Sequence, residues 1–120
     1  MSNAWRTLIS NQLNTIIKEA GAQALAFYSQ GLTWELKPDG SPVTNADRIC
    51  QKFLTEKLIQ LVPEATICAE EEPAQHTLSD GLCWIIDPID GTANFLKKVP
   101  FFCVNIALCQ DQKPIISATY

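Results

Sequence analysis

The sequence has little of what common nucleophilic and cofactor-binding sites require. It contains one histidine, His76, which lies in a polar stretch, and no G-x-S-x-G motif, which argues against a Ser-His-Asp site. Its 5 glycines are too far apart for a G-x-G-x-x-G or P-loop motif. The longest stretch without a charged residue, 20–34, is too short and too polar to span a bilayer. We therefore expect neither a dinucleotide-binding protein nor a membrane span.

The cysteines show no pairing pattern. Their number is odd, and the sequence has no C-x-x-C motif. Each of them lies in an apolar run: Cys50, Cys68, Cys83, Cys103 and Cys109. This pattern favours buried free thiols in a reducing compartment and argues against structural zinc. We therefore expect a cytoplasmic protein.

Positive charge is absent from one long part of the chain. The formal net charge is −4, from 9 Lys and Arg against 13 Asp and Glu. The window 64–90 has no Lys or Arg and contains these acidic residues: Glu64, Glu70, Glu71, Glu72, Asp80, Asp87 and Asp90. A nucleic-acid binder usually shows a basic stripe instead, so no nucleic-acid partner is predicted. Clustered acidic groups repel one another, and a bound cation would relieve that repulsion.

The remaining composition is that of a folded domain, with 47% hydrophobic and 18% charged residues in 120. Apolar residues at steps of three and four predict two amphipathic helices, over 3–29 and from Thr44 to Pro63. Thr44 and Asp47 resemble a capping box at the start of the second helix. The predicted buried stripe of that helix is Ile49, Phe53, Leu54, Leu58 and Leu61.

Strands are expected in the rest of the chain. Apolar or alternating segments predict them over 32–36, 66–69, 82–86, 101–109 and 114–120. Helices that precede strands joined by tight turns favour an α+β fold, with two long helices packed on an antiparallel sheet.

The most informative segment is residues 84–95, with the sequence WIIDPIDGTANF. An apolar strand delivers Asp87 and Asp90 into a Pro/Gly turn, and a buried carboxylate without a partner is costly. Two carboxylates with the Ile89 carbonyl between them suit a hard divalent cation such as Mg²⁺. In a second interpretation, Asp90 is the N-cap of a helical turn over 91–95. The spacing alone leaves both interpretations open.

The acidic run Glu70-Glu71-Glu72 follows another short predicted strand. Such a run is usually a solvated loop. If the two predicted strands 66–69 and 82–86 are neighbours, however, Glu70 at the end of one can face Asp87 at the end of the other.

Three motifs together resemble the inositol monophosphatase superfamily of Mg²⁺-dependent, lithium-sensitive phosphomonoesterases. They are GSPVTNAD at 40–47, Glu70-Glu71, and WIIDPIDGTANF at 84–95, in the family's order and with compatible spacing. The resemblance implies that residues 1–120 form the N-terminal α+β domain of the family's layered sugar-phosphatase-like fold, with an incomplete sheet and no C-terminal domain. It also implies a homodimer for the complete protein and a small phosphorylated substrate.

The resemblance further implies a metal site. Glu70, Asp87 and the Ile89 carbonyl are similar to the ligands of the family's first metal ion. Asp87 and Asp90 are similar to ligands of the second. The family takes a further aspartate for that second site from a W-D-x-A-A-type motif, which this sequence lacks.

Catalytic roles follow from the same resemblance. Glu70 and Thr92 would position and activate the attacking water, with Asp47 hydrogen-bonded to the Thr92 hydroxyl. The backbone N–H groups of Gly91 and Thr92 would hold phosphate oxygens.

We therefore expect hydrolysis of inositol monophosphate or a related small phosphate by the complete protein, and little or no activity from these 120 residues alone. The segments 40–44 and 104–108 are also similar to the bisphosphate nucleotidase branch, and histidinol-phosphate and sugar-bisphosphate phosphatases are further alternatives. An aspartyl-phosphate phosphatase is disfavoured, because it needs D-x-D spacing where this chain has D-x-x-D. A non-catalytic interaction domain that keeps the fold is an alternative of another class.

Overall fold

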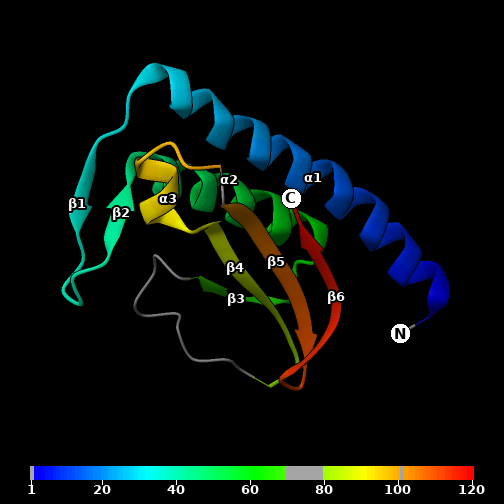
Figure 1. The fold of residues 1–120 in the computed structure, drawn as a ribbon. Helices are drawn as coiled ribbons and strands as arrows, with labels where there is room; N and C mark the ends of the chain where they lie inside the picture. The colour runs from blue at the N-terminus through cyan, green and yellow to red at the C-terminus, as the bar shows by residue number, and fades with distance from the viewer. Residues whose placement is uncertain (1, 70–79, 101) are drawn as a thin grey trace.

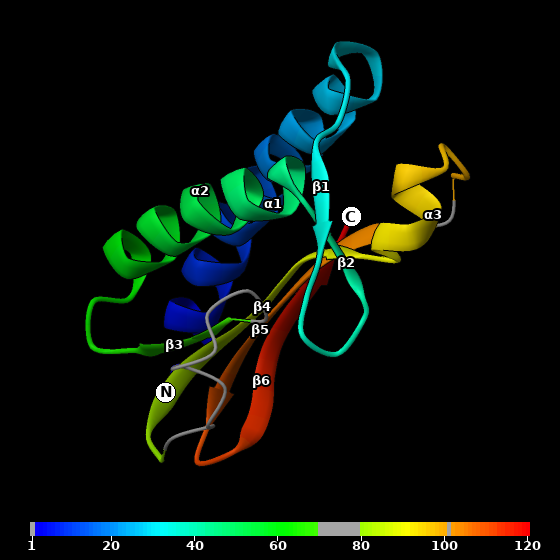
Figure 2. The same cartoon turned by 90° about the vertical axis from the view of Figure 1, so that its left-hand side faces the viewer.

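The computed structural model describes residues 2–69, 80–100 and 102–120. Two helices lie on one face of a four-stranded sheet, and a short two-stranded ribbon and a third helix lie at one end of it (Figures 1 and 2). The elements in chain order are α1 (Asn3–Gln30), β1 (Trp34–Leu36), β2 (Pro42–Thr44), α2 (Asn45–Leu61), β3 (Thr66–Ala69), β4 (Leu82–Asp90), α3 (Thr92–Leu96), β5 (Cys103–Gln110) and β6 (Lys113–Thr119).

Side-chain caps fix the starts of both long helices. The Ser2 hydroxyl accepts the Trp5 N–H over 3.1 Å at the start of α1. Thr44 and Asp47 form a reciprocal capping box at the start of α2, which confirms the sequence prediction. Gly31, at φ 86°, follows the last turn of α1 in a conformation that side chains disfavour. Within the described ranges, no helix is long and apolar enough to cross a membrane.

The sheet has the strand order β3-β4-β5-β6, in which β4, β5 and β6 pair antiparallel. This confirms the predicted α+β class, with the difference that β3 and β4 are parallel, so the sheet is mixed. A parallel pair needs a connection of about a dozen residues, and 12 residues separate Ala69 from Leu82.

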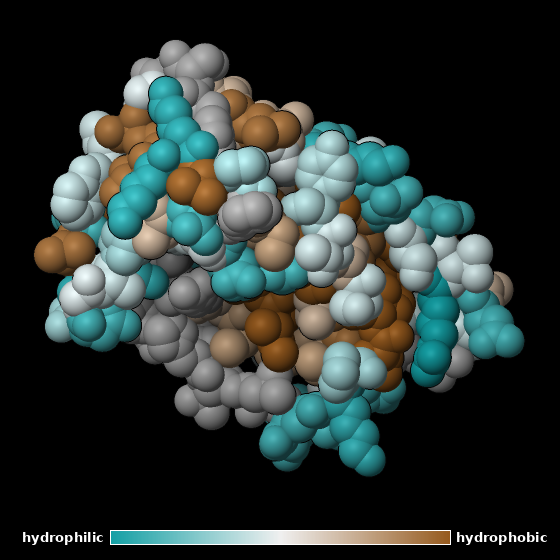
Figure 3. All heavy atoms as spheres, viewed as in Figure 1, coloured by the Kyte–Doolittle hydropathy of each residue, from teal (hydrophilic) through white to brown (hydrophobic). Residues whose placement is uncertain are grey.

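The main hydrophobic core lies between the helices and the sheet, and hydrophobic side chains line the seam between α1 and the sheet (Figure 3). A smaller core lies at the α3 end of the sheet. Its members come from four elements: Ala24, Ala46, Cys50, Ile89 and Phe95.

The predicted buried stripe of α2 needs one correction. Ile49 is 45% exposed, although it was expected to be buried. The buried face of α2 passes through Ala46, Cys50, Leu54 and Leu58 at steps of four, and Ile49 lies beside that line.

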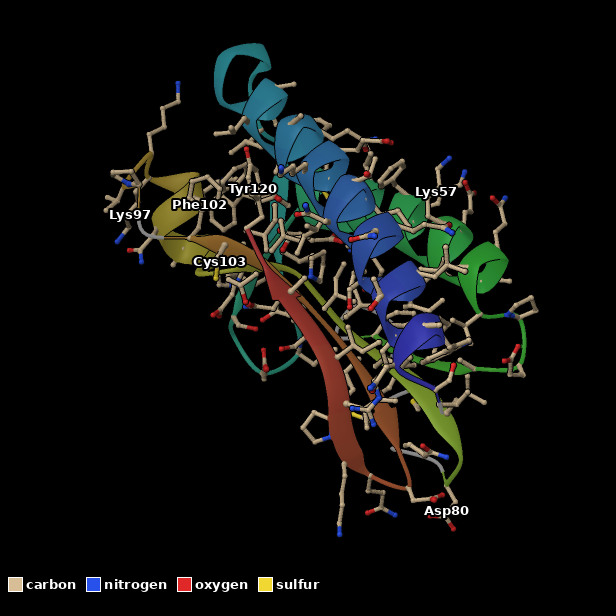
Figure 4. All side chains as sticks on the ribbon, turned by 90° about the vertical axis from the view of Figure 1, so that its right-hand side faces the viewer. Lys57, Asp80, Lys97, Phe102, Cys103 and Tyr120 are labelled. Carbon is tan, nitrogen blue, oxygen red and sulfur yellow. The ribbon has the colours of Figure 1, made fainter. Side chains whose placement is uncertain are left out.

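The first helix and the last residues of the chain are in contact. Tyr120 and Val104 exchange two backbone hydrogen bonds of 3.0 and 2.9 Å, which extend the β5–β6 ladder. The Tyr120 ring lies against Gly21 of α1 (Figure 4), so close that a Cβ atom at position 21 would overlap the ring carbons Cδ1 and Cε1.

Candidate functional site

Strand β4 continues beyond its predicted end at Ile86 and includes both aspartates of the motif. Asp87 pairs with Asn105 of β5, and Asp90 pairs with Cys103. Three steps along β4 therefore match two steps along β5, so β4 carries a bulge with one extra residue.

The bulge determines which face of the sheet each aspartate occupies. Side chains alternate between faces along a regular strand, so residues three apart would point in opposite directions. Asp87 alternates with the core residues Trp84 and Ile86, which places it on the face away from α1 and α2. Asp90 shares that face, because the Cys103 thiol donates to its Oδ2 over 3.9 Å and Asn105 Nδ2 donates to Cys103 Sγ over 3.3 Å.

The turn after β4 contradicts the helix-capping interpretation of Asp90. The N-cap of α3 is Gly91, and no side-chain hydrogen bond caps that helix. Gly91 adopts φ 85° and ψ 38°, a left-handed conformation that glycine reaches without steric cost. The Asp90 side chain is therefore exposed beside the turn and is not used as a cap.

Thr92, the first residue of α3, lies against the start of α2. Its hydroxyl is 3.0 Å from Asp47 Oδ1 and 3.0 Å from the Ile89 carbonyl oxygen. The contact between Thr92 and Asp47 that the family resemblance implied is therefore present. Asp47 is fully buried, so its carboxylate depends on such donors.

Strands β3 and β4 are neighbours in the sheet, which was the condition for Glu70 to face Asp87. Ala69, the last residue of β3, pairs with Ile86, which directly precedes Asp87. Glu70, Glu71, Glu72 and His76 themselves lie outside the described residues. In the part of the chain that the structure does describe, no group of three His, Cys, Asp or Glu side chains is close enough to hold a metal ion.

Some of the described side chains near the turn are suitable ligands for a hard cation, and one is not. Asp87 and Asp90 supply carboxylate oxygens on one face, and Mg²⁺ prefers oxygen ligands and retains several waters. The Cys103 sulfur beside Asp90 is a soft donor that Mg²⁺ does not favour. The two described carboxylates are therefore oxygen donors of the kind that a hard divalent cation prefers, and Glu70, the further ligand that the resemblance implies, lies outside the described residues.

Two polar residues that were not expected from the sequence, Asn105 and Thr119, lie next to the aspartates. The Thr119 hydroxyl donates to Asn105 Oδ1 over 2.7 Å, so Asp87, Asn105 and Thr119 follow one another across three strands. Asn105 alternates with the buried residues Val104 and Ile106. That alternation was the available signal for its position on the aspartate face.

All five cysteines are free, but the predicted burial holds for only three of them. Cys50, Cys83 and Cys109 are buried, whereas Cys68 and Cys103 are half-buried. Burial raises the pKa of the Cys50 thiol to about 12, and the negative charge of Asp47 acts in the same direction.

A sequence model described as the inositol monophosphatase family matches residues 5–120. The chain belongs to the inositol monophosphatase family. The 3'(2'),5'-bisphosphate nucleotidase CysQ of Aggregatibacter actinomycetemcomitans is 35% identical over 108 residues, which are 88% of this chain and 40% of the nucleotidase. Inositol monophosphatase 3 of Solanum lycopersicum is 38% identical over 81 residues, 65% of this chain and 30% of that enzyme.

A solved structure agrees with this membership in the inositol monophosphatase family. An IMPase/NADP phosphatase complexed with NADP and Ca²⁺ superimposes with a TM-score of 0.84 and 26% identity, over 100% of this chain and 46% of that one. The family resemblance and the fold expected from the sequence are thus confirmed. The chain spans less than half the length of these relatives.

Proposed function

We propose that the complete protein is a metal-dependent phosphomonoesterase in which an activated water attacks a small phosphorylated substrate. One observation carries the proposal. The β4 bulge brings Asp87 and Asp90 to the same face of the sheet, and the turn that follows brings the Thr92 hydroxyl to Asp47. The segment 87–92 therefore supplies both the carboxylates that can bind a cation and a hydroxyl that can orient a water molecule.

The proposed cation ligands are Asp87, Asp90, the Ile89 carbonyl and Glu70. We propose Mg²⁺, and the Ca²⁺ in the solved IMPase/NADP phosphatase supports a divalent ion. When bound, such an ion supplies positive charge that neutralises phosphate and lowers the pKa of a coordinated water.

The remaining residues position the reactants. The Thr92 hydroxyl is within donor distance of Asp47, and a proton given to that carboxylate leaves the Thr92 oxygen lone pairs to accept a hydrogen bond from the attacking water. Glu70 is the proposed base that takes the proton of that water. The backbone N–H groups of Gly91 and Thr92 are proposed to hold phosphate oxygens. This fits phosphoryl transfer, which depends on positioning and charge neutralisation.

Two substrate classes are proposed for this site. Inositol monophosphate or a related small phosphate is the first. A 3'(2'),5'-bisphosphate nucleotide is the second, and it is supported by the CysQ nucleotidase, whose match covers 88% of the chain.

The experiment measures phosphate release from both substrates, with and without Mg²⁺, for a version of the chain extended to its relatives' full length. Mg²⁺ binding to the 120-residue chain is measured separately by calorimetry. We expect Mg²⁺-dependent turnover from the extended version, and a loss of about 100-fold or more in Asp87→Asn and Thr92→Val.

Asp80→Asn is the matched control. Asp80 belongs to the same acidic window but lies at the opposite end of the sheet from Cys103 (Figure 4), where Gln112 donates to it over 3.2 Å. This control should keep wild-type turnover and Mg²⁺ binding. Turnover that is independent of Mg²⁺, or that survives Asp87→Asn, would refute the proposal.

A further inference from the structure

The two oxygens of the buried Asp47 carboxylate have different partners. Oδ2 accepts the Thr44 backbone N–H over 2.8 Å and the Thr44 hydroxyl over 2.6 Å. Oδ1 lies 3.0 Å from the Thr92 hydroxyl. Asp47 is fully buried and Thr44 is 1% exposed, so these contacts are shielded from water.

Thr44 therefore does more than cap α2. As an N-cap it needs only to accept the Asp47 N–H, which it does over 3.2 Å. Its own hydroxyl proton goes to Oδ2 of the same aspartate. Two donors on one oxygen restrict rotation of the carboxylate and so fix the direction of the other oxygen.

Thr92 has a choice of acceptors for its single hydroxyl proton. Asp47 Oδ1 and the Ile89 carbonyl oxygen are both 3.0 Å away. A proton given to the Ile89 carbonyl would leave Oδ1 buried without that donor, and it would engage a carbonyl that is proposed to hold a cation. A hydrogen bond to a carboxylate is stronger than one to a neutral carbonyl, provided that the carboxylate oxygen stays in line.

We propose that Thr44 is a positioning residue that directs the Thr92 proton to Asp47. By holding Oδ2 it keeps Oδ1 facing Thr92, and this leaves the Ile89 carbonyl free of the Thr92 hydroxyl. The catalytic consequence rests on the function proposed above, whereas the choice of acceptor is a property of this chain itself.

The test compares Thr44→Val, Thr44→Gly and Thr44→Ser. Valine keeps the shape of threonine without the hydroxyl. Glycine also lacks the hydroxyl but is tolerated as an N-cap, so it serves if the valine variant fails to fold. Serine keeps the hydroxyl and should restore wild-type behaviour. Ser2→Ala is the matched control, because it removes the side-chain N-cap of α1, which begins far from this site in the fold (Figure 1).

The first readout is the NMR signal of the Ile89 carbonyl carbon in the 120-residue chain without metal. In Thr44→Val and Thr44→Gly it should move downfield, as a carbonyl carbon does when its oxygen gains a hydrogen bond, and the Thr92 side-chain rotamer population should change. Thr44→Ser and Ser2→Ala should leave both at wild-type values. An Ile89 signal that stays at its wild-type position in Thr44→Val and Thr44→Gly would overturn the proposal.

The second readout is turnover of the extended version. Thr44→Val and Thr44→Gly should lower kcat by about 10-fold to 100-fold with little change in KM, the range found for residues that orient a ligand or base. Thr44→Ser should restore kcat. An equal fall in Ser2→Ala would mean that lost helix capping is the cause, and it would refute the positioning role. Absence of Mg²⁺-dependent turnover in the wild type would refute the proposed function instead, and the carbonyl signal would still decide the role of Thr44.

Discussion

Cys50 lies three residues after Asp47 on α2, and both side chains are fully buried. The thiol lies 3.6 Å from the Ala20 carbonyl oxygen, within donor distance for sulfur. Its burial, with the nearby Asp47 charge, raises its pKa from the ordinary 9.0 to about 12. Cys50 is therefore a poor nucleophile at neutral pH, and its titration affects stability at high pH.

Stability should fall above pH 9.0, where the unfolded chain loses the Cys50 proton and the folded chain keeps it up to about pH 12. The stabilisation is complete below pH 9.0 and is lost as the pH rises through this window, by about 1.4 kcal/mol per pH unit for one group. Urea denaturation of wild type and Cys50→Ala from about pH 8 to about pH 11 measures the start of this loss, from below the unfolded-state pKa to a point inside the window.

Cys50→Ala should show a shallower slope, and not a flat one, because burial also raises the pKa of the Cys68 and Cys109 thiols. Cys103→Ala, which removes a half-buried thiol, should keep the wild-type slope. The same dependence on pH in wild type and Cys50→Ala would contradict the prediction.

The residue types of the candidate site could be predicted from the sequence, but the orientation of its aspartates could not. The residue types and order of Asp87, Asp90 and Thr92 were enough to suggest oxygen ligands and a hydroxyl. Their common face depends on the extra residue in β4, which is defined only by its pairing with β5. The second bond from Thr44 to Asp47 was also missed, because a capping pattern does not show where the hydroxyl proton points.

At the scale of elements, α1 contacts the residue that directly follows β6, because Gly21 faces the Tyr120 ring. Glycine inside a helix normally costs about 0.5–1 kcal/mol relative to alanine. Here a methyl group would overlap the ring, so the absence of a side chain permits the contact.

We expect Gly21→Ala to give no stabilisation in the wild-type chain, because the Tyr120 ring must move. In a Tyr120→Ala background the same change should stabilise by about 0.5–1 kcal/mol, since the helix gain is then unopposed. A double-mutant cycle by urea denaturation measures the difference.

The exposed neighbour Ala22 supplies the control. Ala22→Gly should cost about 0.5–1 kcal/mol in both backgrounds, which calibrates local helix propensity. Equal stabilisation by Gly21→Ala with and without the tyrosine ring would contradict the proposed overlap.

The elements differ in how far their sequences define them. The long helices were predictable because their apolar period and the Thr44 cap are local signals. The parallel direction of β3 was not, because apolar strands alternate in the same way in either direction. The 12-residue connection between Ala69 and Leu82 is long enough for the crossover of a parallel pair, but it does not exclude an antiparallel one.

At the scale of the whole molecule, stability should come from the cores and not from surface charge. Leu54 is fully buried in the main core. The Arg48–Glu35 ion pair joins α2 to the ribbon, but its side chains are 60% and 59% exposed.

Leu54→Ala should therefore lower the free energy of unfolding by about 2–5 kcal/mol, through lost burial and the cavity it leaves. Glu35→Ala should cost about 1 kcal/mol or less, and less still in high salt. Urea denaturation at low and high salt separates the two. A larger effect from Glu35→Ala than from Leu54→Ala would place the stability in the ribbon instead.

The packing of α1 on β5 and β6 has a consequence for synthesis on the ribosome. The apolar stripe of α1, including Ile9, Leu13 and Ile17, is made before β5 and β6, two of the strands that cover it. Contacts so distant in sequence form slowly, so the part of the stripe that faces the sheet stays exposed until β5 and β6 have been made, even though α2 can already pack against α1. We therefore expect a chaperone that binds apolar segments to bind this chain during translation, before the sheet has formed.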